Sequence, residues 1–292
     1  MNLRRLIESK KILMFDGAMG TQLEIKGAQV GPISNIESPE IVEAIHREYV
    51  AAGAEFIITN TFTMNKVYVN SHGIDFDYLE CNRKGVELAL KASENKAFVL
   101  GGLGPTGQLL EPYGTLTEKE AYDAYLEQAK TLASAGANGL IFETMTDVNE
   151  LLAGVKACKD NLELPVFASL TYLSSADGGR TPMGNKAYDC AAAIEKAGAD
   201  VIGINCGTIE PSIYALIVKT YKSVSNLPVL IEPNAGSPRL EKDETVYDMP
   251  PDEFITTIKS CIDAGATLAG GCCGTTPGHI KAVADYLCSI KK

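Results

Sequence analysis

The sequence has no tryptophan, no apolar run of about 18 residues and no excess of basic residues. We therefore expect no transmembrane helix and no contact with a membrane. The 26 Lys and Arg against 37 Asp and Glu give a formal charge of −11, which argues against a nucleic acid as partner. With 12 Tyr and 8 Phe but no Trp, there is no obvious aromatic cage for a quaternary ammonium group. The N-terminal stretch also lacks the long apolar segment and the cleavage site of a signal peptide.

Low-complexity tracts, blocks of like charge and linkers rich in Pro, Gly or Ser are also missing. We therefore expect one domain over residues 1–292, and the 46% of hydrophobic residues supply ample material for its core. The eight cysteines, with no secretory signal, predict a cytoplasmic protein. In a reducing compartment, thiols serve as core residues, nucleophiles or metal ligands.

One pattern recurs along the chain: a helical stretch ends in Ala-Gly-Ala and a short apolar segment follows. It occurs in AAGAEFIITN, SAGANGLIFET, KAGADVIGIN and DAGATLAGGCC. The glycine suits the left-handed residue that ends a helix, and the apolar segment predicts a buried strand. An extended search predicts eight strands: Ile12 to Asp16, Phe56 to Thr61, Phe98 to Gly104, Leu140 to Thr144, Val166 to Thr171, Val201 to Cys206, Val229 to Asn234 and Thr267 to Cys272.

Amphipathic helical patterns fill most of the gaps between these strands. SPEIVEAIHREYVAA predicts a helix with Ser38 as N-cap and Pro39 at its first position. A later helix starts at Thr117, where Glu120 completes a capping box. Eight strand–helix units in about 250 to 300 residues are typical of an α/β protein with the (β/α)8 TIM-barrel fold. The alternative is a doubly wound open sheet, but no G-x-G-x-x-G follows the first strand.

A barrel of this kind carries its functional residues at the C-terminal ends of its strands. Besides cysteines, the predicted strand ends carry these acidic and polar residues: Asp16, Asn60, Glu143, Thr171, Asn205, Glu232 and Asn234. An acid directly after an apolar strand is costly to leave unpaired, so Asp16 and Glu143 fit an amine on a ligand. Alternatively, Asp16 caps a turn and Glu143 pairs with a basic side chain. Asn234 and Thr171 are further substrate-binding candidates, or they satisfy loop backbone groups.

Three cysteines are expected to converge at the same end of the barrel. Cys206 ends the sixth strand, and Cys272 and Cys273 end the eighth. Adjacent residues of an extended strand point to opposite faces, so a shared role requires the backbone to leave strand geometry, which the flanking glycines allow. Three thiolates fit a tetrahedral Zn²⁺ with one position open. Alternatively, Cys206 is an ordinary buried thiol and the adjacent pair forms a disulfide.

The remaining cysteines and a nearby histidine are not assigned to this metal site. His279 lies in the first turn of the last helix, with Thr276 as N-cap and Pro277 at the first position. We therefore expect it to face solvent or a loop. The cysteines that fall within helical patterns are predicted to be packing residues; they are Cys81, Cys158, Cys190, Cys261 and Cys288.

The motifs of the chain resemble those of the homocysteine S-methyltransferase family, in the same order from about Asp16 to His279. They are DGAMGTQL, TNTF, GPTG, FET, GINC, PNAG and GGCCGTTPGHI. The resemblance implies a (β/α)8 barrel with Zn²⁺ held by three cysteines, which match Cys206, Cys272 and Cys273. It also implies that acids matching Asp16 and Glu143 bind the amino group of homocysteine.

The activity implied by this resemblance is methyl transfer to homocysteine, which forms methionine. A metal-bound thiol is deprotonated, so no separate general base is expected. The family's cobalamin-dependent methionine synthase has further modules for which 292 residues leave no room, so we expect an external donor. The donor is a methylcorrinoid or methylfolate bound on a separate protein, a sulfonium, or a quaternary amine such as betaine. The missing aromatic cage disfavours betaine, and the likeness to the bacterial synthase module favours a methylcorrinoid or methylfolate.

One segment departs from the family pattern. After GINC the family usually has a small residue and then GP, whereas this chain has GTIEPS, which places the charge of Glu210 near the site if the loop folds over it. Two alternatives to the main hypothesis therefore remain. The same zinc–thiolate chemistry could serve another small thiol or run in reverse as a demethylase, or the barrel could bind zinc and thiols without turnover.

Overall fold

The computed structural model describes residues 3–9, 11–241 and 244–290 of the chain. Eight parallel strands form a barrel in the order β1-β10-β7-β6-β5-β4-β3-β2, and a bridge between Phe15 and Phe56 closes the ring. The strands are β1 (Leu13–Met14), β2 (Phe56–Ile58), β3 (Phe98–Leu103), β4 (Gly139–Met145), β5 (Val166–Leu170), β6 (Val201–Asn205), β7 (Val229–Glu232) and β10 (Leu268–Ala269). The prediction of eight strands in a (β/α)8 TIM barrel is confirmed.

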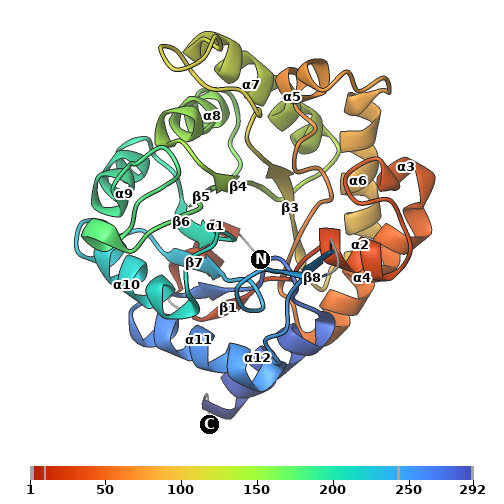
Figure 1. Cartoon of the computed structure of the whole chain (residues 1–292). Coiled ribbons are helices and arrows are strands. Elements are labelled where there is room, and N and C mark those ends of the chain that lie inside the picture. Colours follow the sequence, from red (N-terminus) through yellow and green to blue (C-terminus); the bar gives the residue numbers. More distant parts are fainter. Residues whose placement is uncertain (1–2, 10, 242–243, 291–292) are drawn as a thin grey trace.

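Most helices surround the strands as an outer ring, whereas α1 lies within that ring in the view of Figure 1. The helices are α1 (Leu3–Glu8), α2 (Gly20–Ile25), α3 (Ser34–Glu37), α4 (Pro39–Ala52), α5 (Lys66–Ser71), α6 (Tyr78–Ser93), α7 (Glu118–Ser134), α8 (Val148–Asn161), α9 (Ala187–Lys196), α10 (Pro211–Lys222), α11 (Pro251–Asp263) and α12 (Pro277–Ile290), with a 3-10 turn at Ala176–Gly178. A two-stranded antiparallel hairpin of β8 (Arg239–Glu241) and β9 (Glu244–Val246) follows β7. The sequence patterns predicted neither this hairpin nor α1.

Local sequence signals account for most of the helix boundaries. The four Ala-Gly-Ala turns place glycine in the left-handed region, with φ between 84° and 113°; these are Gly53, Gly136, Gly198 and Gly265. The capping box of Thr117 and Glu120 is confirmed at the start of α7. Ser38 occupies the N-cap position of α4 and Pro39 its first position, as predicted, although the Ser38 side chain makes no capping hydrogen bond.

The lower part of the barrel is filled with apolar side chains. Inward-facing residues of the eight strands form one buried cluster, in which the rings of Phe15 and Phe56 are stacked with centroids 4.6 Å apart. Leu3 and Ile7 of α1 belong to the same cluster, so this helix closes the N-terminal end of the barrel. Because that end is packed, polar chemistry is confined to the C-terminal ends of the strands, here called the barrel mouth.

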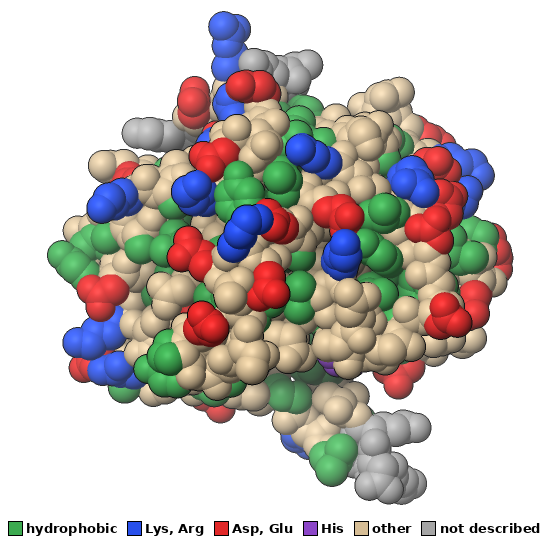
Figure 2. All heavy atoms as spheres, turned by 90° about the horizontal axis from the view of Figure 1, so that it is seen from above, with side chains coloured by type: hydrophobic (Ala, Val, Ile, Leu, Met, Phe, Trp, Pro, Cys, Tyr) green, Lys and Arg blue, Asp and Glu red, His purple; other side chains and the backbone are tan. Residues whose placement is uncertain are grey.

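The outer surface carries mixed charges. Figure 2 shows acidic and basic side chains interspersed over the face that it presents. Ion pairs one helical turn apart include Lys119 with Asp123 and Lys156 with Asp160. Among the described residues, no helix is long and apolar enough to cross a membrane. Four of the five helical cysteines are buried as predicted, whereas Cys288 is exposed, so the prediction that it packs in the core was wrong.

Candidate metal and substrate site

Three thiols meet in the barrel mouth. The Sγ atom of Cys273 lies 3.8 Å from that of Cys206 and 4.0 Å from that of Cys272, and all three sulfur atoms lie within 4.8 Å of one another. All three cysteines are partly exposed and free. The separation of 4.0 Å also means that Cys272 and Cys273 do not form the disulfide considered as an alternative, because a disulfide bond is about 2.05 Å long.

A tight turn brings the two adjacent cysteines to one side. The backbone N–H of Thr275 donates to the carbonyl of Cys272 at 3.1 Å, and its hydroxyl donates to the same oxygen at 2.7 Å. Gly271 permits this turn, since an added Cβ would lie only 2.5 Å from the Thr275 side chain. The chain has thus left strand geometry, as the flanking glycines predict, and both thiols turn toward Cys206.

The spacing of the thiols fits a single metal ion. With Zn–S bonds of about 2.3 Å and tetrahedral angles, two sulfur ligands would lie about 3.8 Å apart. The sulfur separations of 3.8 and 4.0 Å are close to this value. The site is therefore suited to a thiophilic metal such as Zn²⁺.

The three thiols share charge through hydrogen bonds. Hydrogen bonds from Cys206 and Cys272 lower the pKa of Cys273 well below the usual thiol range. Hydrogen bonds with Cys206 and Cys273 raise the pKa of Cys272. The three thiols therefore titrate together, and a bound metal ion would displace the protons that they carry.

Two carboxylates predicted to bind substrate lie close to the thiols. Asp16 is 3% exposed, and its Oδ2 accepts a hydrogen bond from the backbone N–H of Ile58 at 2.9 Å. Burial raises the pKa of Asp16, as the nearby Glu143 does to a lesser extent. Burial and the charge on Cys273 raise the pKa of Glu143 to about 7. Glu143 forms no ion pair within the described part of the chain, so the alternative hypothesis that it pairs with a basic side chain is wrong.

Thr171 and Asn234 both lie next to Gly207. The side-chain amide of Asn234 donates to the Gly207 carbonyl at 2.9 Å, and an added Cβ at Gly207 would lie 2.6 Å from Thr171 Oγ1. Thr171 Oγ1 and Asn234 Oδ1 are both buried without a hydrogen-bond partner. Buried polar atoms are nearly always paired, so these two atoms mark a place where a ligand can bind.

Asn205 is a site residue that the sequence analysis placed at a strand end without giving it a role. Its Oδ1 accepts from the backbone N–H of Thr144 at 2.8 Å and from the hydroxyl of Ser169 at 2.7 Å. Its Nδ2 donates to Thr144 Oγ1 at 2.7 Å and lies 3.9 Å from Cys272 Sγ. Thr144 has a φ of 54°, a conformation that Asn205 stabilises directly after Glu143.

Two further residues reach the site from the hairpin and from β7. Tyr247, just after β9, contacts Cys273, and this hydrogen bond helps to lower the pKa of the thiol. Glu232 ends β7 and is 2% exposed, with its Oε2 buried and unpartnered. Only its position at a strand end could have indicated Glu232 from the sequence, and nothing local indicated Tyr247.

His279 and Glu210 lie where they make no contact with the thiols. His279 is 6% exposed, its Nε2 is 2.8 Å from the Met249 carbonyl, and its Nδ1 contacts Thr276, so it faces a loop as predicted. Glu210 is exposed directly before α10.

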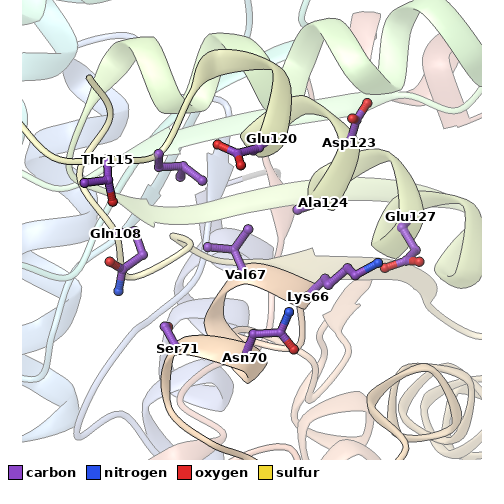
Figure 3. A pocket seen from close by; sticks show the side chains of 11 residues that line it. Lys66, Val67, Asn70, Ser71, Gln108, Thr115, Glu120, Asp123, Ala124 and Glu127 are labelled. Atoms are coloured by element: carbon purple, nitrogen blue, oxygen red, sulfur yellow. The ribbon is translucent and has the colours of Figure 1, made fainter. Parts of the chain in front are cut away.

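A separate cavity of about 650 Å³ lies between α5 and α7 (Figure 3). Charged and polar side chains line it, among them Lys66, Glu120, Asp123 and Glu127. In Figure 3 the side chain of Lys66 points toward Glu127. The cavity contains none of the site residues predicted from the sequence.

Known proteins resemble this chain over nearly its whole length. The family model described as homocysteine S-methyltransferase matches residues 13–287. A methionine synthase from Mycobacterium tuberculosis is 32% identical over 97% of this chain, which spans about a quarter (25%) of that protein. Homocysteine S-methyltransferase 1 of Arabidopsis thaliana is 28% identical over 93% of this chain and 92% of its own length.

The fold has a close counterpart among solved structures. The metallated form of the homocysteine methyltransferase MmuM from Escherichia coli aligns over 98% of this chain and 100% of its own, with a TM-score of 0.81 and 24% identity. This likeness confirms the barrel fold. With a family model that matches nearly the whole chain, the protein belongs to the homocysteine S-methyltransferase family.

Proposed function

We propose that the protein transfers a methyl group from an external donor to the thiol of homocysteine, forming methionine. The observation that carries this proposal is the group of three thiols at the spacing of a single metal site, beside buried carboxylates, in a barrel of this family. Thiolates select a thiophilic metal, and ammonium groups are the natural partners of buried acids.

Cys206, Cys272 and Cys273 would hold the metal ion, for which Zn²⁺ fits the donor set. Bound Zn²⁺ would supply the Lewis acidity that keeps a substrate thiol deprotonated at neutral pH. Asn205 would steady this cluster through its contacts with Thr144 and Cys272. The partial exposure of the three cysteines leaves the cluster accessible from the barrel mouth.

The carboxylates and the unpartnered polar atoms would orient the amino acid. Asp16 and Glu143 would accept hydrogen bonds from the substrate ammonium, which would lower the raised pKa of Glu143 and keep it ionised. Asn234 Oδ1 is an acceptor and fits an N–H donor, whereas the Thr171 hydroxyl can donate to the substrate carboxylate. Hydrogen bonds to both the ammonium and the carboxylate of the substrate would orient its thiol toward the cysteines.

The donor would come from outside the chain. We favour a methylcorrinoid or methylfolate-linked donor, supported by the 32% identity to a methionine synthase. A sulfonium and a quaternary amine are the other donors to test. A reducing compartment such as the cytoplasm would keep the three thiols available for metal binding.

The test is zinc content together with homocysteine binding by calorimetry at several pH values, on wild type and Cys273→Ala. We expect one zinc per chain, and binding that releases a proton in the wild type but is lost in the variant. Cys288→Ala is the matched control, because its thiol is exposed and remote from the cluster. Full zinc and homocysteine binding in Cys273→Ala would refute the assigned metal site.

Activity assays then separate the alternatives. With each donor class supplied in turn, methionine formation supports the proposal. Methyl transfer to another thiol, or demethylation of methionine, would instead support the alternative that the same zinc–thiolate chemistry acts on a different acceptor or in reverse. Binding of zinc and homocysteine without any turnover would indicate a non-catalytic thiol-binding barrel.

A further inference from the structure

Glu232 is a buried acid in the barrel mouth to which the proposed function assigns no role. It is the last residue of β7, two positions after Leu230, which belongs to the apolar cluster inside the barrel. Side chains two apart on a strand point to the same face, so Glu232 also points into the barrel. At the inward-facing position after Leu230, β7 therefore carries a carboxylate instead of an apolar side chain.

The carboxylate of Glu232 lacks a partner within the described residues. It is 2% exposed, its Oε2 is buried without a hydrogen bond, and no basic side chain forms an ion pair with it in the described ranges. A buried unpaired carboxylate costs several kcal/mol. A residue that only filled space here would be apolar, like Val229, Leu230 and Ile231 before it.

Three carboxylates share this part of the mouth. An added Cβ at Gly270 would lie 3.4 Å from Glu232 Cγ and 2.8 Å from the Asp16 carbonyl. Asp16 and Glu143 are close enough for their charges to act on Glu232. Glu143 lies beside Gly102, since an added Cβ at this glycine would lie 3.4 Å from Glu143 Oε2.

We infer that Glu232 is a third ammonium-binding carboxylate and restricts the acceptor to thiols that carry a primary ammonium group. This inference rests on the proposed function and extends it. A primary ammonium has three N–H donors, one for each of Asp16, Glu143 and Glu232. An acceptor without the amino group gains none of these contacts and therefore binds more weakly than one that carries it.

The experiment measures thiol binding to the zinc-loaded full chain by calorimetry. The ligands are homocysteine and 4-mercaptobutanoic acid, which has the same chain without the amino group. In Glu232→Gln we expect homocysteine to bind roughly 10- to 100-fold more weakly, the range for loss of a hydrogen bond to a charged group. The binding of 4-mercaptobutanoic acid and the zinc content stay within about twofold of wild type, because neither depends on the ammonium contact.

Glu150→Gln is the matched control. Glu150 is also buried, but its carboxylate accepts hydrogen bonds from Thr106 and Tyr125 away from the thiols, so its replacement should not change the preference between the two ligands. Homocysteine binding in Glu232→Gln within threefold of wild type overturns the inference alone. Equal weakening of both ligands, or loss of zinc, also overturns it, since Glu232 would then be structural. A wild-type protein that binds neither thiol overturns the inference and the proposed function together.

Discussion

His46 lies on α4 as a buried residue without partners. Its side chain is fully buried, and neither ring nitrogen has a hydrogen-bond partner among the described residues. Burial lowers the pKa of His46 to about 4, from an ordinary value of 6.5. The folded protein therefore holds this ring neutral at pH values where the unfolded chain protonates it.

At the residue scale, we predict that His46 makes the fold sensitive to acid. The folded pKa is the lower one, so this group has no effect on stability above pH 6.5 and destabilises the fold as pH falls toward 4. Between pH 7 and pH 5 the loss is about 2 kcal/mol. His46→Leu should remove this loss in urea unfolding of the metal-free protein under reducing conditions.

His72→Leu is the control for this prediction, because His72 is exposed at the end of α5. If His46→Leu and wild type lose equal stability between pH 7 and pH 5, then His46 is not buried as a neutral ring.

At the scale of elements, two helix starts with similar sequence signals differ in structure. Thr117 caps α7 through hydrogen bonds with the backbone and side chain of Glu120. Ser38 occupies the same position before α4, where Pro39 follows and no side-chain capping bond forms. The same type of residue thus stabilises one helix and only precedes the other.

We therefore predict different costs for the two matching substitutions. Thr117→Ala should lower the free energy of unfolding by about 1 kcal/mol, because one backbone N–H at the helix start loses its acceptor. Ser38→Ala should change it by at most a few tenths, since no capping bond is lost. Urea unfolding of both variants measures the difference, and equal costs would mean that the capping box contributes nothing.

At the scale of the whole molecule, the apolar cluster inside the barrel and the group of three cysteines lie at different ends of the barrel. The apolar clusters fill the helix–sheet interfaces and the lower barrel, with α1 closing the N-terminal end. The three cysteines lie just beyond β6 and β10, outside these clusters. We therefore expect folding not to depend on metal binding, in contrast to a zinc finger.

We predict that removal of metal with a chelator leaves the barrel folded. Far-UV circular dichroism at 25 °C should be unchanged, while Tm falls by roughly 4–8 °C relative to protein with free zinc at about 100 times its Kd. Cys273→Ala should show no such dependence of Tm on zinc. Loss of the far-UV signal on chelation would mean that the metal holds the fold together.

Local sequence signals were enough to predict the eight strands of the barrel and the cysteines at its mouth, although not α1 or the hairpin of β8 and β9. Apolar runs, Ala-Gly-Ala turns and the Thr117 capping box are local signals that act within a few residues. The barrel then follows from the repeated unit, and its topology brings the end of β6 close to that of β10. The convergence of Cys206 with Cys272 and Cys273 could therefore be predicted without coordinates.

Only the tertiary structure decided which polar atoms have partners. Glu232 Oε2 is unpartnered, Asn205 links Thr144 to Cys272, and Tyr247 of an unpredicted hairpin reaches Cys273. Each of these facts depends on atoms from segments far apart in sequence. A local pattern determines backbone conformation and periodicity, whereas hydrogen bonding and burial depend on how distant segments pack together.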